Sequence, residues 1–410
     1  MQRRQWFDWH SWAGFQLSIL MTFVLVTGTF ATVSFELDWL ANDAVRAKHG
    51  QPAQLDWGGV LDSASKHYPD ATLVWANAPI APWFNAEVVA TRADDSLFRI
   101  YVDPMTLEVS GEGRWYNWQR FFRMTHRHLM LPIPIGVTIV GLLSLPLLVS
   151  LLSSFFIYKK WWRGFFRWPA HRTYANAKPV RKARTLWAAL HRLAGVWSLW
   201  FIFLIAATGL WYLLEQWGAR AQYPPVPIPV VALEDAPRLS GAAINQMHTR
   251  AIEAYPDLQI TQVSLRDWNK GAVLFQGQSD ALLVRPRANH VLVGMSPEEI
   301  DVRRASTLGW YVRIAEAMDP LHFGTFGGAV TRFLWFFFGA LMSLLSITGV
   351  YLFGLRVARS NKRYFSSGTE VAALSWHGLR PWARWVPVVL LLLMSVLVTI
   401  IFLIDPGLLI

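Results

Sequence analysis

Hydrophobic residues along this chain gather into five long runs that are separated by polar segments. The runs cover residues 11–34, 132–157, 190–213, 330–353 and 386–404. Each run has about the 20 residues that a helix needs to cross the hydrocarbon core of a bilayer. The pattern therefore predicts a membrane protein, mainly α-helical, whose bundle contains about five transmembrane spans.

Two polar segments, 45–115 and 236–300, follow the first and third runs. In each segment one stretch predicts a helix, Leu55 to Tyr68 in the first and Ala243 to Tyr255 in the second. The strands predicted in the first segment are Leu73–Trp75, Ala86–Ala90, Phe98–Val102 and, after a turn at Asp103-Pro104, Leu107–Val109. Those predicted in the second are Ile260–Leu265, Ala272–Phe275, Leu282–Arg285 and Val291–Val293. Two small α+β domains are expected.

The first and third runs share a pattern. Four residues of the first run align with four of the third at one constant offset of 181 residues: His10, Gly14, Thr27 and Gly28 with His191, Gly195, Thr208 and Gly209. The second and fourth runs align more weakly, because His128 and His322 each stand 26 residues before a hydroxyl residue, Ser154 or Thr348. A duplicated unit of span, domain and span is predicted, with one extra helix and a pseudo-two-fold axis along the membrane normal.

These patterns divide the chain as follows: first span 1–44, first domain 45–125, second span 126–158, basic loop 159–187, third span 188–216, second domain 217–320, fourth span 321–356, loop 357–384 and fifth span 385–410. The first run is longer than the apolar part of a signal peptide and continues into polar sequence without small residues, so it is expected to be retained.

Charge orients the predicted spans. The chain has 38 basic and 27 acidic residues, and the basic ones gather beside the spans. The loop between the second and third spans holds nine basic residues and no acidic one: Lys159, Lys160, Arg163, Arg167, Arg172, Lys178, Arg181, Lys182 and Arg184. The positive-inside rule places this loop and the N-terminus in the cytoplasm and both polar domains outside. A lipid bilayer is the expected partner, and nucleic acid is not.

Composition narrows the chemistry. The chain has no cysteine, which excludes disulfides, cysteine-bound iron–sulfur clusters, thiolate haem ligation and cysteine nucleophiles. It has no G-x-x-x-x-G-K, G-x-G-x-x-G, G-x-S-x-G or H-E-x-x-H motif, so no site for ATP, NAD(P)H or flavin and no hydrolase motif is evident. A redox function would have to use histidine, methionine, aromatic residues or a bound cofactor.

The repeated histidines suggest such a cofactor. His10 and His191 would lie at the cytoplasmic edge, and His128 and His322 at the periplasmic edge. Each pair faces the pseudo-two-fold axis, which is the arrangement that a bis-histidine b-type haem needs, so two such haems are predicted. Gly14 and Gly195 follow the cytoplasmic histidines by four residues, on the same helix face, where they would leave room for the porphyrin or let helices approach closely. The alternative is that these histidines are ordinary interfacial residues; zinc or copper would need a tighter cluster of ligands.

Two more histidines lie near these positions. His126 is two residues from His128, so one of them is expected to ligate while the other contacts a propionate or the substrate. His377 resembles a third copy of the cytoplasmic histidine and is an alternative ligand in place of His10 or His191. The remaining histidines are expected at the surface: His49, His67, His171, His248 and His290.

The repeated LHRLAG…TG and WHSWAG…TG segments resemble those of the PepSY-associated transmembrane proteins, and the two polar domains resemble PepSY domains. The stretch from Phe98 to Pro104 with Leu107-Glu108-Val109 is similar to the strand–turn–strand end of that domain, although Leu107 stands where the family often has glycine. Stand-alone members of similar size include inner-membrane ferric-siderophore reductases of Gram-negative bacteria. The resemblance thus implies two PepSY-like periplasmic domains on a haem-containing electron conduit in the bacterial inner membrane.

The function expected from this resemblance is transfer of electrons from a cytoplasmic or membrane donor to the Fe(III) of a periplasmic siderophore, with release of iron. The expected partners are the ferric siderophore, the electron donor and periplasmic siderophore-binding proteins. Trp115, Tyr116, Trp118 and Arg123 are candidates for the docking surface or for interfacial anchoring. The alternatives are a PepSY-domain protein that binds or regulates a protein partner without redox activity, and a haem conduit to a protein or quinone.

Overall fold

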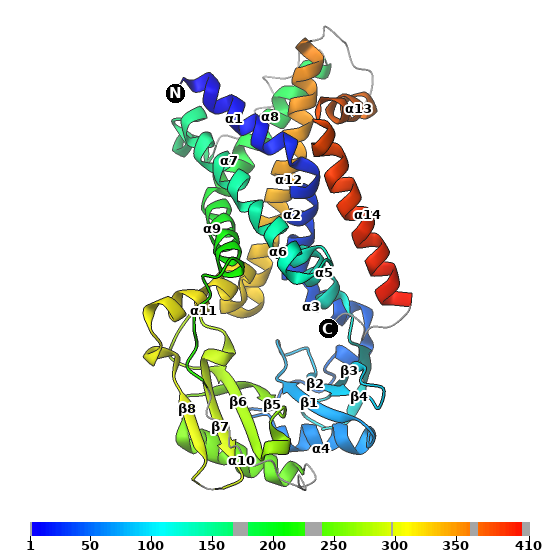
Figure 1. The fold of residues 1–410 in the computed structure, drawn as a ribbon, viewed down its shortest axis with the longest axis vertical. Helices are drawn as coiled ribbons and strands as arrows, with labels where there is room; N and C mark the ends of the chain where they lie inside the picture. The colour runs from blue at the N-terminus through cyan, green and yellow to red at the C-terminus, as the bar shows by residue number, and fades with distance from the viewer. Residues whose placement is uncertain (1, 167–178, 226–239, 297, 361–367, 404–410) are drawn as a thin grey trace. The chain divides into compact units, whose positions relative to one another are not determined.

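The computed structural model describes residues 2–166, 179–225, 240–296, 298–360 and 368–403 (Figure 1). The chain divides into two compact units. Unit 1 comprises Met1–Val33, Phe122–Ala219 and Phe333–Thr399, and unit 2 comprises Ser34–Phe121, Arg220–Arg332 and Ile400–Ile410. The predicted positions of His171 and of the chain end near Asp405 lie outside the described residues.

Unit 1 is helical. Its helices are α1 (Arg3–Gln16), α2 (Ser18–Thr32), the end of α5 (Trp118–His128), α6 (Ile133–Leu142), α7 (Ser144–Ile157), α8 (Pro179–Trp197), α9 (Leu199–Gln216), most of α12 (Gly328–Ser360), α13 (Gly368–Gly378) and most of α14 (Pro381–Leu403), with a 3₁₀ turn η2 (Trp161–Gly164). Within the described residues four segments are long and apolar enough to cross a membrane: Ile133–Ile157, Leu199–Gln216, Thr325–Arg356 and Pro381–Ile401. A fifth results if α1 and α2 form one bent span, since their axes differ by 69°.

The first and third predicted spans are each broken, which differs from the continuous helices expected. The breaks fall at Leu17 and at Ser198, where the backbone leaves helical geometry, and the offset of 181 residues again separates them. The reason lies in the composition on the N-terminal side of each break. Both α1 and α8 carry charged residues that are costly in hydrocarbon, whereas α2 and α9 carry none before Glu215. His10 and His191 therefore belong to α1 and α8, and not to the apolar helices that follow.

Small and hydroxylated residues let the helices of unit 1 pack closely. On α2 and α12, Thr22 Oγ1 lies 2.7 Å from Ser346 Oγ, and Thr29 Oγ1 lies 3.3 Å from Ser343 Oγ. A side chain at Gly339 would meet Thr29 Oγ1 at 2.8 Å. Between helices that are surrounded by lipid, the hydrophobic effect does not drive association, and close packing with hydrogen bonds takes its place. They fix α2 against α12.

Unit 2 contains one antiparallel sheet of eight strands in the order β4-β3-β2-β1-β5-β6-β7-β8. The strands are β1 (Thr72–Asn77), β2 (Ala86–Thr91), β3 (Leu97–Val102), β4 (Val109–Arg114), β5 (Gln259–Ser264), β6 (Ala272–Gln278), β7 (Asn289–Gly294) and β8 (Ile300–Arg303). Both polar segments thus contribute four strands each, and they join into one sheet where β1 pairs with β5. Helices α4 (Trp57–His67) and α10 (Gly241–Ala254) pack side by side on one face of the sheet and bury its apolar residues (Figure 1).

The two helices meet at a pair of glycines. A Cβ on Gly58 would lie 2.2 Å from the carbonyl oxygen of Gly241, and a Cβ on Gly241 would lie 2.6 Å from the carbonyl oxygen of Gly58. The backbone nitrogen of Gly241 donates to Asp62 Oδ1 at 2.6 Å, and that of Gly58 donates to Asn245 Oδ1 at 2.9 Å. Each helix therefore satisfies an N-terminal donor of the other, and only glycine allows the approach.

Further short elements complete unit 2. They are α3 (Ser34–Ala41), the 3₁₀ turns η1 (Asp43–Val45), η4 (Trp268–Lys270), η5 (Pro286–Ala288), η6 (Ala305–Thr307) and η7 (Thr325–Gly327), and α11 (Trp310–Phe323). The first turn of α5 also belongs here, and Asp38 caps it by accepting from the backbone nitrogens of Trp118 and Gln119 at 2.7 and 3.1 Å.

The strand predictions were confirmed for most of the sheet and wrong at three places. Leu282–Arg285 is not a strand, because Leu283 has a φ of 56° and the following residues are held by α11. Strand β8 was missed. In the first half, β4 begins only at Val109, because Leu107 has a φ of 60° and lies in the turn. Leu107 occupies the left-handed conformation that glycine adopts most easily, at the position where glycine was expected from the resemblance.

Candidate cofactor site

A cavity of about 1700 Å³ lies within unit 1. It is larger than the roughly 300–1,000 Å³ of most ligand pockets. Residues of α1, α2, α7, α8, α9 and α12 line it, and most of them are apolar. His10 and His191 are the two histidines in this lining, so the structure brings together the first predicted pair in one space.

His10 is held by α7. Its Nδ1 lies 3.0 Å from the carbonyl oxygen of Ser150 and 3.1 Å from Ser153 Oγ. The Ser153 hydroxyl donates to the Val149 carbonyl at 2.6 Å, so it is free to accept from the ring. Because a carbonyl oxygen can only accept, Nδ1 must carry the proton. The neutral ring therefore has its lone pair on Nε2, the nitrogen that a metal would bind.

His191 is held in the same way by α12. Its Nδ1 lies 2.8 Å from Thr348 Oγ1, and the Thr348 hydroxyl donates to the Leu344 carbonyl at 2.7 Å. The hydroxyl has used its proton, so it accepts from Nδ1 of His191 and leaves the lone pair on Nε2. Histidines that bind metals usually donate their other ring nitrogen to such an acceptor, which fixes both the tautomer and the orientation of the ring.

The two glycines predicted near these histidines border the cavity. A Cβ on Gly14 would meet no atom within 4 Å, and a Cβ on Gly195 would meet only Leu345 Cδ2 at 3.8 Å. Close packing of helices would place backbone or side-chain atoms much nearer, as it does at Gly339. Gly14 and Gly195 therefore border open space, and room for a porphyrin there stays a prediction.

Positive charge lines the cavity as well. Three arginines contribute to its wall, Arg184, Arg192 and Arg356, whereas its lining contains no aspartate or glutamate. Arg356 is held in place, since Nη1 donates to Ser11 Oγ at 3.3 Å and its guanidinium lies 4.2 Å from the centre of the Phe7 ring. An apolar space with three arginines in its wall suits a flat apolar ligand that carries carboxylates.

His126 and His128 occupy different environments, as expected from their spacing, and neither lines the cavity. His126 Nδ1 lies 2.9 Å from the carbonyl oxygen of Val24 on α2. A side chain on Gly28 would meet the His126 ring at 2.6 Å, so this glycine provides room for the imidazole. His128 is buried, and its Nδ1 lies 2.7 Å from the Leu131 carbonyl of its own turn. Both rings thus also place their lone pair on Nε2.

The other two candidate ligands lie elsewhere. His322 is near the end of α11 in unit 2, whereas His128 belongs to unit 1, so their pairing stays a prediction. His377 lies on α13, is exposed and is not part of the cavity lining. The cavity therefore favours His10 and His191 over His377 as a pair.

One of the histidines expected at the surface is buried. His290 has an exposed fraction of 1%, because β7 is an inner strand of the sheet that is buried along its whole length. His49 and His67 are exposed as expected, and His248 is half-buried.

Two of the four residues expected at a docking or interfacial surface are also buried, Trp115 and Tyr116. The guanidinium of Arg120 lies over the Trp115 ring at 3.7 Å and that of Arg99 at 4.9 Å, which explains the burial of this indole. Trp118 and Arg123 are exposed.

The sequence contained a signal for the acceptors that hold the two cavity histidines. Thr348 and Ser154 were aligned only because they follow His322 and His128 by 26 residues. In the structure Thr348 binds His191, and Ser153, the neighbour of Ser154, binds His10. Nothing in the sequence indicated that arginines line the cavity. Arg356 and Arg184 look like the basic residues that flank the cytoplasmic ends of spans.

The donor set limits what the site can hold. Among the described residues there is no group of three or more histidine, cysteine, aspartate or glutamate side chains that would hold a metal ion. Two imidazoles alone are too few for a structural zinc site. They suit a metal whose remaining ligands come with it, as the four nitrogens of a porphyrin do.

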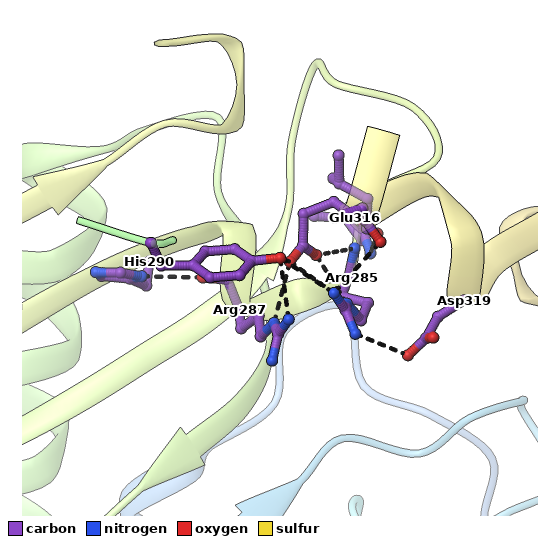
Figure 2. Close-up of polar contacts among 9 residues, drawn as sticks. Arg285, Arg287, His290, Glu316 and Asp319 are labelled. Atoms are coloured by element: carbon purple, nitrogen blue, oxygen red, sulfur yellow. Dashed lines mark hydrogen bonds and ion pairs between the residues drawn. The ribbon is translucent and has the colours of Figure 1, made fainter. Parts of the chain in front are cut away.

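A second polar cluster lies in unit 2, around the fully buried carboxylate of Glu316 (Figure 2). Arg285 donates from Nε and Nη2 to the two carboxylate oxygens at 3.0 Å each, and Arg287 donates from Nε at 3.1 Å. The Tyr223 hydroxyl donates to the same carboxylate. Burial alone would raise the pKa of Glu316, but the hydrogen bonds from Arg285 and Tyr223 outweigh it and hold that pKa below its usual range. The cluster fastens the loop before β7 to α11, the helix that carries His322.

The comparisons with known proteins agree with this architecture. The chain matches the family described as the PepSY-associated TM region over residues 7–356, which includes both cavity histidines. No curated protein matches the chain. Because the match covers most of the sequence, the chain belongs to the PepSY-associated transmembrane family.

Proposed function

We propose that this protein is a haem-containing reductase of the bacterial inner membrane, which carries electrons across the membrane to Fe(III)-siderophore in the periplasm. The observation that carries the proposal is the cavity of unit 1, where His10 and His191 both keep the Nε2 lone pair available. The cavity would lie toward the cytoplasm, and the sheet of unit 2 would lie in the periplasm, as the distribution of basic residues predicts.

His10 and His191 would hold the iron of a b-type haem, which supplies a one-electron carrier when bound. Ser153 and Thr348 keep both rings in the ligating tautomer, and Gly14 and Gly195 leave room for the macrocycle. The apolar part of the wall would shield the haem from water and insulate its electron.

The arginines of the wall are suited to the carboxylates of the haem. A propionate that enters an apolar cavity needs a partner of opposite charge, because an isolated buried carboxylate is strongly disfavoured. Arg356 is the best placed, since Ser11 and Phe7 already hold its side chain. Arg184 and Arg192 line the same cavity and would hold a second carboxylate.

A second haem is proposed near His128 and His322, with His126 as the alternative ligand. The support is the tautomer of His126 and His128, which matches that of the cavity histidines. His126 differs in being anchored on a neighbouring helix, where Gly28 provides the room for its ring. That anchoring suits a ligand whose orientation must be fixed.

The proposed substrate is Fe(III) held by a siderophore. One electron from a cytoplasmic or membrane donor reduces Fe(III) to Fe(II), and the siderophore is released unchanged. Hard oxygen ligands bind Fe(III) far more strongly than Fe(II), so the reduction loosens the metal. Siderophore, donor and any periplasmic siderophore-binding protein are proposed from the family resemblance.

The test is an absorption spectrum of the detergent-purified protein, oxidised and dithionite-reduced, with a pyridine haemochrome assay. Sharp α and β bands in the reduced protein, lost or weakened in His10→Ala and His191→Ala, are expected. His377→Ala is the matched control, because this histidine is exposed and lies outside the cavity lining. A colourless protein from cells with ample haem would overturn the proposal and favour a protein that binds a partner through its sheet.

A further inference from the structure

One row of polar side chains crosses the sheet of unit 2 in register. Each residue is the direct cross-strand partner of the next, from β3 through β2, β1, β5, β6 and β7 to β8: Tyr101, Glu87, Asn77, Gln262, Gln276, His290 and Arg303. Seven of the eight strands thus contribute one polar residue at the same level. We call these seven residues the polar row.

The polar row lies on the face that α4 and α10 do not cover. Successive side chains of a strand point to opposite faces. The neighbours of the row along each strand belong to the core that packs beneath the two helices, and they are Ile100, Val88, Ala76, Val263, Phe275 and Val291. The row therefore points away from both helices.

The side chains in the middle of the row are held in fixed positions. Gln262 Nε2 donates to Asn77 Oδ1 at 2.8 Å, and Asn77 Nδ2 donates to Glu87 Oε1 at 2.9 Å. Arg99 from the adjacent level neutralises Glu87 through an ion pair. A sheet face that only contacts water can carry mobile, charged side chains, whereas this one presents half-buried amides joined by hydrogen bonds. Gln276 continues the row beside them.

Elements of the same unit border the row at both ends. At the β3 end, Tyr101 is itself buried, and the Trp115 ring packs edge-on against Trp75 of β1, one level away from Asn77. At the β8 end, Arg303 donates to the carbonyl oxygens of Pro224 and Pro225 at 2.6 and 3.1 Å. Tyr101 and His290 are buried, whereas Asn77, Gln262 and Gln276 are half-buried, so the accessible part of the row is its centre, where the two halves of the sheet meet.

The charge next to this centre is positive. Arg266 is exposed, and its guanidinium lies 5.0 Å from the centre of the Trp75 ring at the level adjacent to Asn77. Glu87 is already paired, so it does not cancel this charge. Amide N–H groups beside a cation bind oxygen atoms with partial or full negative charge.

We propose that the centre of the polar row, with Arg266, is the docking surface for an anionic, oxygen-rich iron(III) chelate. The chelate oxygens accept hydrogen bonds from the amides of Asn77, Gln262 and Gln276, and Arg266 balances the negative charge. That this chelate is the electron acceptor rests on the proposed function. The surface that binds it and its negative charge are inferred from the sheet.

The test introduces a charge of either sign at Gln276, whose neutral side chain is half-buried. Binding of the trianionic iron(III) complex of a tricatechol is measured by equilibrium dialysis, with radioactive iron, on the full-length protein in detergent. We expect Gln276→Glu to weaken binding and Gln276→Lys to strengthen it, each by on the order of tenfold at low salt. A purely structural role would make both variants worse.

The matched controls are Gln246→Glu and Gln246→Lys, because Gln246 is an exposed residue on α10, the helix that covers the opposite face. Both should bind as the unmodified protein does. Equal binding by all four variants would overturn the inference, and so would a loss in both Gln276 variants. Dialysis does not depend on haem, so a colourless protein that shows the charge effect would refute the reductase and keep the docking surface. A protein with normal haem bands but no charge effect would refute the docking surface and keep the haem-containing reductase.

Discussion

Replacing Thr348 by valine should release the haem without disturbing the fold. Thr348 Oγ1 accepts a hydrogen bond from Nδ1 of His191 at 2.8 Å. Valine has nearly the same shape as threonine, and Thr348 is buried, so the packing around the site stays close to that of the original protein. The change removes one acceptor and leaves His191 in place.

The expected magnitude follows from the role of that acceptor. Without it, Nδ1–H loses its partner in an apolar wall, and an unpaired buried donor costs about 1–3 kcal/mol. The ring would then rotate, or its proton would move from Nδ1 to Nε2. A protonated Nε2 has no lone pair and cannot bind iron. Since 1.4 kcal/mol corresponds to tenfold, haem affinity should fall by roughly 10–100-fold, the range found for such supporting groups around metals.

The assay is the haem-to-protein ratio from the pyridine haemochrome, followed during competition with excess apomyoglobin. Thr348→Ser keeps the hydroxyl and should retain haem. Ser346→Ala removes a hydroxyl of the cavity lining, one that contacts Thr22 and not a histidine, and should also retain haem. If Thr348→Val held its haem as well as these two controls, the argument that the tautomer of His191 matters would be refuted.

Three further predictions follow from the same structure. Gly14→Leu should place a side chain in the cavity and lose the bound haem. The melting temperature of the protein should stay equal or rise, because leucine is a better helix former than glycine by up to about 1 kcal/mol. Gly14→Ala should lose less haem. Gly58→Ala should lower the free energy of unfolding of the sheet unit by about 1–3 kcal/mol, measured by urea titration, because the methyl group meets the Gly241 carbonyl at 2.2 Å; Gly309→Ala, where a Cβ meets nothing within 4 Å, should cost little. Glu316→Gln should cost about 3–5 kcal/mol, because Arg287 loses the carboxylate that it pairs with and Arg285 keeps only its ion pair with Asp319.

The last variant also gives a pH dependence. The folded pKa of Glu316 lies below its value in the unfolded chain, so its contribution to stability is present above about pH 4.5 and is lost as the pH falls further. Urea midpoints measured between pH 3 and pH 7 should therefore fall less steeply in Glu316→Gln than in the unmodified protein. Glu253→Gln on the exposed side of α10 should leave the slope unchanged. Parallel slopes for all three proteins would contradict the assignment of the ion pair.

Much of the helical architecture could be predicted because it depends on local composition. Apolar length alone located the spans around Ile133–Ile157 and Thr325–Arg356 within a few residues. It failed at Leu17 and Ser198, since hydropathy averages over a window and does not register a local break in helical geometry. Leu282–Arg285 failed for the opposite reason: the apolar pattern favours a strand, and a long-range tie from Arg285 to Glu316 overrides it.

The candidate site was predicted in part. A constant offset between two predicted repeats singled out His10, His191 and the glycines beside them, because such an offset marks equivalent positions. It could not reveal that Nδ1 of each histidine is bound by a hydroxyl from a distant helix, Ser153 or Thr348. The polar row could not be predicted from the sequence either, because it also depends on long-range contacts. Asn77 and Gln262 become neighbours only through the register of β1 and β5. The duplication, the bound haem and the orientation in the membrane stay predictions.

The pairing of β1 with β5 also has a consequence for how the protein is made. Asn77 and its partner Gln262 are separated by 185 residues. At ~5–20 residues per second, synthesis of the intervening chain takes on the order of 10–40 s. During that interval the first four strands have an open edge at β1, whose unpaired N–H and C=O groups can template association with another chain. Ribosomes stalled before Gln259 would hold that edge open indefinitely, so nascent chains of this length should cross-link to one another through β1, and completion of β5 should abolish the cross-link.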